Sequence, residues 1–142
     1  MKIVQINSVS GVGSTGRIAV DIAKVLEEFG HTCYIAYGHR NTTYHNSYKI
    51  GNNFIQLFHN VFFTRLLGLH GYGSIFSTYK FTRWLDHVKP DIIHLHNIHS
   101  NYINYRILFK YIIKRNIPVV FTLHDCFNFT GKCSHYHSVS YN

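Results

Sequence analysis

The sequence predicts an α/β domain of three layers, in which helices cover both faces of a mostly parallel sheet. Short apolar runs typical of buried strands alternate along the chain with longer segments of helical periodicity. A glycine-rich turn over residues 11–16 follows the first strand and opens the first helix. The 142 residues are enough for one such domain with a hydrophobic core.

The amino-terminal half begins with a strand, a helix and a second strand. Residues 3–6 form an apolar run that predicts a buried strand. Apolar side chains recur at helical spacing over residues 17–29, and a glycine follows them as a C-terminal cap. Residues 32–37 predict the second strand. The polar stretch 39–53 is predicted to be a loop with one short strand near residues 48–50.

The second half continues the alternation. Residues 54–69 carry Phe and Leu on a helical stripe and predict a helix. Ser74 is the predicted N-cap of another helix that runs to Val88. The remaining predicted elements are a strand over 92–96, a helix over 102–115 and a strand over 118–123.

The predicted sheet order places a ligand site at one edge. If the strands are ordered 3-2-1-4-5, the order reverses between the first strand and the strand at 92–96. Ligands of such sheets bind where the order reverses, at the carboxyl ends of the strands. The glycine-rich turn, the segment 94–99 and the pair His124-Asp125 are therefore expected to meet there.

The glycine-rich turn predicts a phosphate site. Its glycines allow backbone amides to approach an anion, and the start of the following helix favours negative charge. A tight turn without a ligand is the alternative. NAD is disfavoured because Tyr37-Gly38-His39-Arg40 stands where an acidic residue is needed, while Arg40 leaves an NADP site open.

Histidines gather at the ends of the last two strands. His94 and His96 share one face of a strand, and with His99 they predict a polar cluster that binds hydroxyl or phosphate oxygens; a buried histidine and a zinc pair are the alternatives. His124 can bind a sugar hydroxyl or move a proton, and Asp125 can orient it, or else cap the next turn. Further along the chain, two interpretations remain, a metal knuckle or a loop disulfide. The residues concerned are Cys126, Cys133, His135 and His137.

The composition and charge of the chain indicate which kinds of partner it binds. Lys and Arg total 14 against 6 Asp and Glu, a formal charge of +8 that favours an anionic partner. The basic residues are scattered and no nucleic-acid-binding signature occurs, so no specific nucleic acid is expected. No signal peptide or membrane span is found, which with three cysteines favours the cytoplasm. The 54–69 helix is expected either in the core or against a membrane surface, with Arg65, Lys80 and Arg83 near anionic headgroups.

Five segments, in this order, carry a resemblance that spans nearly the whole chain. The chain resembles the amino-terminal domain of a family 4 glycosyltransferase, of the GT-B class found among bacterial surface-polysaccharide enzymes. The most specific matches are the His94 to His99 stretch and the segment 122–131. The five segments are 1–7, 13–19, 90–99, 118–126 and 129–133.

The resemblance implies a fold and a division of labour. It implies a Rossmann-like domain, one half of a GT-B fold, in which residues 1–142 hold the glycan or lipid-linked acceptor. An absent carboxy-terminal domain would hold the nucleotide-sugar donor. Such enzymes typically retain the anomeric configuration and need neither an essential metal nor a separate cofactor. The implied roles are donor-phosphate binding by Gly13, Ser14, Thr15, Gly16 and Arg17, catalysis by His124 and Asp125, and acceptor binding by His96, Asn97 and His99.

Departures from the family set further expectations. The paired-glutamate motif of the second domain is absent, and Ser100 stands where relatives often have glycine. We therefore expect no turnover by the 142 residues alone and, for the complete enzyme, a location in the cytoplasm or at the inner face of the membrane. A non-catalytic nucleotide- or phosphate-binding module and an NADP-binding domain are the alternatives.

Overall fold

The computed structural model describes residues 1–69 and 71–130. A five-stranded sheet forms its centre, with the order β3-β2-β1-β4-β5 and parallel pairing throughout. The α/β fold class and the predicted strand order are confirmed. The strands are β1 (Lys2–Asn7), β2 (Thr32–Tyr37), β3 (Ser47–Lys49), β4 (Ile92–Leu95) and β5 (Val119–Phe121).

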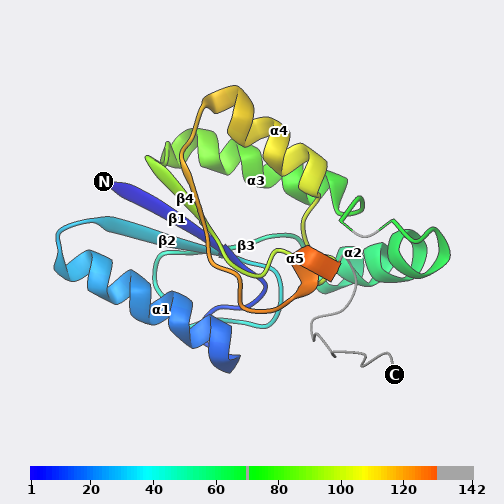
Figure 1. The fold of residues 1–142 in the computed structure, drawn as a ribbon, viewed down its shortest axis with the longest axis horizontal. Coiled ribbons are helices and arrows are strands. Elements are labelled where there is room, and N and C mark those ends of the chain that lie inside the picture. Colours follow the sequence, from blue (N-terminus) through cyan, green and yellow to red (C-terminus); the bar gives the residue numbers. More distant parts are fainter. Residues whose placement is uncertain (70, 131–142) are drawn as a thin grey trace, which may run out of the picture.

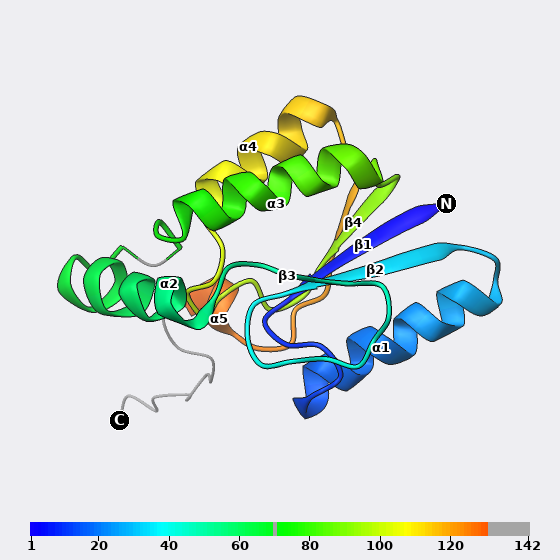
Figure 2. The ribbon, with the colours of Figure 1, turned by 180° about the vertical axis from the view of Figure 1, so that it is seen from behind.

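Helices cover both faces of the sheet (Figures 1 and 2). Helix α1 lies on one face, and α3 and α4 lie on the other. Helix α2 and the π-helix η1 extend beyond the carboxyl ends of the strands, and the short α5 follows β5. Their bounds are α1 (Gly13–Glu28), α2 (Asn53–Phe58), η1 (His59–Leu66), α3 (Ile75–Val88), α4 (Tyr105–Arg115) and α5 (Phe127–Thr130).

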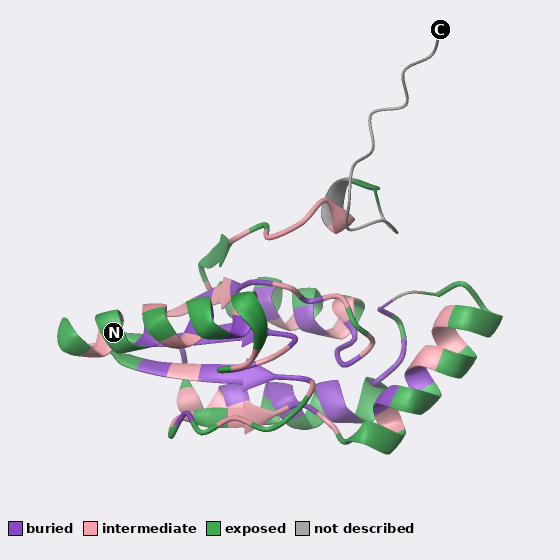
Figure 3. Ribbon diagram, turned by 90° about the horizontal axis from the view of Figure 1, so that it is seen from below, coloured by how far each residue is buried: buried purple, intermediate pink, exposed green. Residues whose placement is uncertain are grey.

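The core sits on both sides of the central strand β1. Val4 and Ile6 are fully buried in one cluster with Phe81 of α3. Ile3, on the opposite side of the strand, packs with Ala19 of α1. Figure 3 shows the buried residues gathered along the sheet and on the inner sides of the helices. A strand buried on both faces reads as an apolar run rather than an alternating one, which is why the sequence indicated it.

Helix α1 begins at Gly13, earlier than the apolar periodicity predicted. The first turn carries small residues, so it has no apolar stripe to detect. Gly11 N–H donates to the carbonyl of Gly16 at 2.9 Å, and a Cβ at Gly16 would lie 3.1 Å from Val9. The turn is therefore tight, and a larger residue at position 16 would have to displace its neighbours by a few tenths of an ångström. The helix ends as predicted, with Gly30 at a φ of +78°.

The predicted helix over 54–69 divides into α2 and η1. A π-helix is wider than an α-helix, and periodicity does not distinguish the two over such a length. The imidazole of His59, fully buried, accepts a hydrogen bond from Gly73 N–H and bonds to the hydroxyl of Ser74. Ser74 stands at the start of α3 with its hydroxyl engaged there, and so makes no side-chain cap. His59 thus ties the start of η1 to the start of α3.

The last two predicted elements are shorter than expected. Helix α4 begins after Asn104, whose side chain caps it, and not at Tyr102. Tyr102 is instead fully buried and donates its hydroxyl proton to the carbonyl of Asn97. Strand β5 covers only three residues at the sheet edge, and its side chains are exposed. Within residues 1–69 and 71–130, no helix is long and apolar enough to cross a bilayer.

Candidate functional site

Hydrogen bonds join the ends of three strands, β1, β2 and β4, on the carboxyl edge of the sheet. The carbonyl of Ser8, after β1, accepts hydrogen bonds from the amides of Gly38 and His39, after β2. The side-chain oxygen of Asn7 accepts from the amide of Asn97, after β4. The order reverses here because β1 has β2 on one side and β4 on the other. The ends of these strands therefore form the predicted ligand-binding edge.

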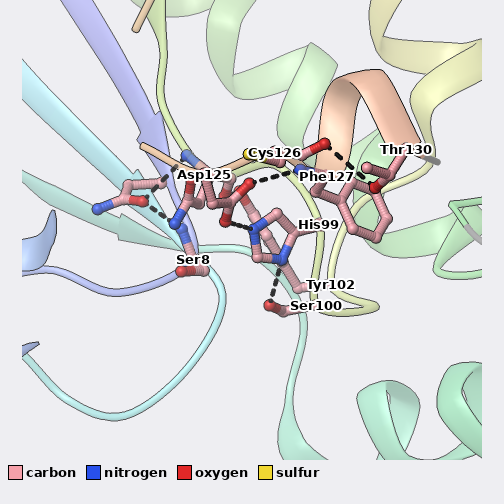
Figure 4. Close-up of polar contacts among 10 residues, drawn as sticks. Ser8, His99, Ser100, Tyr102, Asp125, Cys126, Phe127 and Thr130 are labelled. Atoms are coloured by element: carbon pink, nitrogen blue, oxygen red, sulfur yellow. Dashed lines mark hydrogen bonds and ion pairs between the residues drawn. The ribbon is translucent and has the colours of Figure 1, made fainter. Parts of the chain in front are cut away.

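His99 and Asp125 form a pair across this edge. Nε2 of His99 lies 2.8 Å from Oδ2 of Asp125, and Nδ1 lies 3.2 Å from the hydroxyl of Ser100 (Figure 4). The other carboxylate oxygen accepts from the amide of Phe127 at 3.0 Å. The two side chains keep 21% and 15% of their surface exposed. Asp125 thus caps the following turn, which was the alternative expected for it. The prediction that it orients His124 is wrong, because the loop after β4 brings His99 to its carboxylate instead.

Three imidazoles form a row beside this pair. The rings of His94 and His96 lie 4.1 Å apart between centroids, and those of His96 and His124 lie 5.2 Å apart. Nδ1 of His96 is 2.9 Å from Nε2 of His124, and His94 bonds to the hydroxyl of Thr122. Burial, with His94 and His124 nearby, lowers the pKa of His96 to about 3. Burial also lowers the pKa of His94, so both rings are neutral at physiological pH.

His96 lies deeper than the other histidines of the site. Its side chain is 1% exposed, and its Nε2 bonds to the side-chain oxygen of Gln5 at 2.8 Å. Both ring nitrogens are therefore bonded to protein groups. Asn97, His99, His124 and Asp125 retain partial exposure and stand at the surface of the edge.

Helix α1 begins without a side-chain cap. Val12 stands at the N-cap position without a side-chain cap, and the first turn carries no acidic residue. The first amides of a helix lack intrahelical acceptors and sit at the positive end of its dipole. Gly13, Ser14 and Arg17 are exposed, Thr15 is half-buried and Gly16 is buried.

The predicted site residues form two groups. His96, Asn97, His99, His124 and Asp125 come together at the ends of β4 and β5. Residues 13–17 follow β1 at the same edge, but within the described chain they share no hydrogen bond with the histidines. Arg17 instead lines a groove of about 440 Å³ between α1 and the loop after β2, with Lys24, Thr42 and His45.

The sequence did not predict that two buried polar residues of β1 contribute to the site. Gln5 and Asn7 are fully buried in β1, yet their side chains bond to groups from several elements of the site. The detectable signal is a polar residue inside an apolar strand, because a buried amide requires partners. Arg40, considered for NADP, is exposed.

The metal sites considered from the sequence lie only partly within the described residues. Among the described residues, no group of three His, Cys, Asp or Glu side chains is placed to hold a metal ion. Cys126 is half-buried before α5. Cys133, His135 and His137 lie outside the described residues, so the proposed knuckle or disulfide stays a prediction.

Comparison with known proteins identifies the family. No curated protein matches the chain significantly. The family model described as Glycosyltransferase Family 4 matches residues 15–141, which include both groups of predicted site residues except Gly13 and Ser14. The match agrees with the parallel sheet, its order and the polar edge where its strands end. The chain belongs to glycosyltransferase family 4.

Proposed function

We propose that this chain is the acceptor-side domain of a retaining glycosyltransferase that transfers a sugar from a nucleotide-sugar donor to a glycan or lipid-linked acceptor, in surface polysaccharide biosynthesis. The observation that carries the proposal is the pairing of His99 with Asp125 beside His124. Partly exposed imidazole and carboxylate groups at a reversal of strand order suit a ligand rich in hydroxyls.

The donor phosphates are assigned to the start of α1. Amides over residues 13–16 and the helix dipole stabilise negative charge, and Arg17 adds a charge-assisted bond. A nucleoside diphosphate leaves more readily when its developing charge is stabilised in this way. The nucleotide sugar is the substrate, and no separate cofactor is proposed.

The sugar and the acceptor are assigned to the histidine edge. Asn97 and His99 line the acceptor side, and His99 is held by Asp125. His124 contacts the transferred sugar, and the buried ring of His96 holds His124 in place through a hydrogen bond. Retention follows if the acceptor oxygen attacks C1 from the face that the phosphate leaves: the new C–O bond forms, the C1–O phosphate bond breaks and a phosphate oxygen takes the acceptor proton.

A lipid-linked acceptor fits the surface next to this edge. Exposed apolar side chains cover α2, η1 and the start of α3, with Phe54 78% and Phe76 81% exposed. An apolar groove of about 240 Å³ lies between these helices. Residues 29–85 contain no acidic side chain, whereas Arg65, Lys80 and Arg83 are exposed. We infer that this surface contacts an anionic membrane, at its cytoplasmic face.

Hydrogen bonds connect this surface to the loop that carries His99. The hydroxyl of Thr64 in η1 donates to the side chain of Asn101, and His39 bonds to the carbonyl of Ser100, both in the loop after β4. That loop also holds His99. A lipid carrier bound at α2 and η1 would therefore present its headgroup near the His99–Asp125 pair.

A binding experiment tests the proposal. NMR titrations of the 142-residue chain with UDP-glucose and GDP-mannose should shift signals of residues 13–17 and His124 at millimolar ligand. Replacement of Arg17 by Gln should weaken binding about threefold to tenfold, while Arg106→Gln on α4 should have no effect. Shifts confined to other regions would refute the assignment. Tighter binding of NADP, or steep salt-dependent binding of an oligonucleotide, would favour the alternative functions.

A further inference from the structure

A chain of hydrogen bonds connects the interior of the sheet to His124. It begins at Gln5 in the central strand, passes through the buried ring of His96 and ends at Nε2 of His124. Gln5 and His96 lie on the face of the sheet that α1 partly covers, because Gln5 pairs in register with His94, two residues before His96, and bonds to the carbonyl of Ala19 in α1. His124 reaches His96 from the loop after β5. The direction of each hydrogen bond in this chain is determined by its neighbours.

The orientation of the Gln5 amide is the first step. Its nitrogen donates to the carbonyl oxygen of Ala19 at 2.8 Å and to the sulfur of Cys33 at 3.3 Å. A flipped amide would place its oxygen against that carbonyl, with two acceptors facing each other. The amide oxygen of Gln5 must therefore face His96, and it can only accept.

The protonation of His96 is the second step. Since Gln5 offers an acceptor at 2.8 Å, the proton of the neutral ring lies on Nε2. The low pKa of His96, caused first by burial, leaves no second proton at neutral pH. Nδ1 is then a bare nitrogen and accepts a hydrogen bond. Its partner at 2.9 Å is Nε2 of His124, which must donate.

We propose that Gln5 and His96 are positioning residues that fix His124 as its Nε2–H tautomer. When His124 is neutral, its Nδ1 is a bare acceptor, and within the described residues Nδ1 has no hydrogen-bond partner. Nδ1 accepts a hydrogen bond from a hydroxyl group of the bound sugar. The site thereby selects ligands that present a hydroxyl at this position over ligands that present a deoxy or ether group. The sugar as ligand rests on the proposed function, whereas the tautomer does not.

The tautomer is measurable without activity. In the 15N-histidine-labelled 142-residue chain at about pH 7.5, two-dimensional 15N–1H spectra distinguish protonated from bare ring nitrogens. Variants at positions 96 and 124 assign the signals. We expect His124 to carry its proton on Nε2 by at least about tenfold over Nδ1, because the other tautomer loses the bond to His96. A scalar coupling across that bond should link the protonated His124 nitrogen to a bare Nδ1 of His96.

A matched pair of variants tests the role of Gln5. Gln5→Met removes the acceptor and should give His124 mixed tautomers, visible as averaged nitrogen shifts. Gln56→Met removes another buried glutamine, bonded to the carbonyls of Gly38 and Ile50, and should leave His124 unchanged. If Gln5→Met does not fold, the wild-type spectrum still decides the tautomer.

The outcomes separate the two proposals. A proton on Nδ1 of His124, or equal tautomers in the wild-type chain, overturns the inference, as does an unchanged spectrum in folded Gln5→Met. A single Nε2–H tautomer in a chain that binds no nucleotide sugar would leave the inference intact and count against the proposed function.

Discussion

Acid should destabilise this fold through His96, and the replacement His96→Gln should remove that sensitivity. The ring is 1% exposed and its pKa falls from 6.5 to about 3, with burial as the main cause. In the unfolded chain the ring of His96 is protonated below about pH 6.5. In the folded chain the ring stays neutral down to about pH 3. Between these values the unfolded state holds more protons, so stability is full above the upper value and falls as the pH is lowered. Gln offers an amide that can still donate to Gln5 but does not titrate.

The size of the effect follows from the width of this window. One pH unit is worth about 1.4 kcal/mol for a group that titrates only in the unfolded state. At about pH 4.5 the unfolded His96 has been protonated over about two units, which gives an upper bound of about 2.7 kcal/mol. Relaxation around the charged ring reduces this bound, so we expect between about 1 and about 3 kcal/mol.

Urea denaturation at pH 7.5 and at pH 4.5 measures the effect. The free energy of unfolding should drop between the two values by about 1 to 3 kcal/mol more in the wild type than in His96→Gln. His87→Gln is the matched control, because His87 is exposed on α3 and the substitution also removes one histidine. An equal drop in the wild type and in His96→Gln would refute the reasoning, and so would a larger drop in the variant.

Three other predictions concern separate parts of the structure. A Cβ at Gly38 would overlap the ring of Tyr102, so Gly38→Ala should lower the free energy of unfolding by about 1 to 3 kcal/mol in urea; no change would contradict this packing. Amide exchange at Phe127 should accelerate in Asp125→Ala but not in Asp125→Asn, which keeps an accepting oxygen; equal rates would contradict the cap. In a sedimentation assay, a larger fraction of the protein should bind to anionic vesicles than to neutral ones. The double variant Phe58→Ser, Phe62→Ser should bind to the anionic vesicles about tenfold more weakly. Phe109→Ser, on α4, is its control, and equal binding by all the proteins would refute the lipid surface.

Much of the fold could be predicted because its signals are local. The strands β1, β2 and β4 are apolar runs, and the helix α1 ends at a glycine with a positive φ, so pattern and structure agree. The parallel pairing followed from the alternation of strands and helices, because parallel strands need crossovers. The order assumed in placing the ligand site is the order observed. The π-helix η1 was missed because apolar periodicity does not distinguish a π-helix from an α-helix over this length. The contacts of His59 with Gly73 and Ser74, before α3, are also not local in sequence.

The candidate site was predictable in position and not in geometry. Strand ends of a parallel sheet lie at one edge, which placed His99 and Asp125 together without any knowledge of their contact. Which histidine would pair with the carboxylate depends on the path of the loops after β4 and β5. The sequence order His124-Asp125 pointed to neighbours in the chain, whereas the observed partner of Asp125 is 26 residues away. Backbone geometry at these loops decides that choice, and no local pattern encodes it.

The polar side chains beneath the site are better explained by orientation than by stability. A buried glutamine in a central strand has to recover the cost of desolvating its amide through hydrogen bonds, and a leucine there would bring no such cost. Gln5 does satisfy both ends of its amide, with partners on α1, on β2 and just after β4. An apolar residue of similar size would fill the same space, but it would leave the buried Nε2–H of His96 without its acceptor and His124 free to change its tautomer. A buried amide that holds a partly exposed imidazole through a second ring is expected where the orientation of that imidazole matters for function.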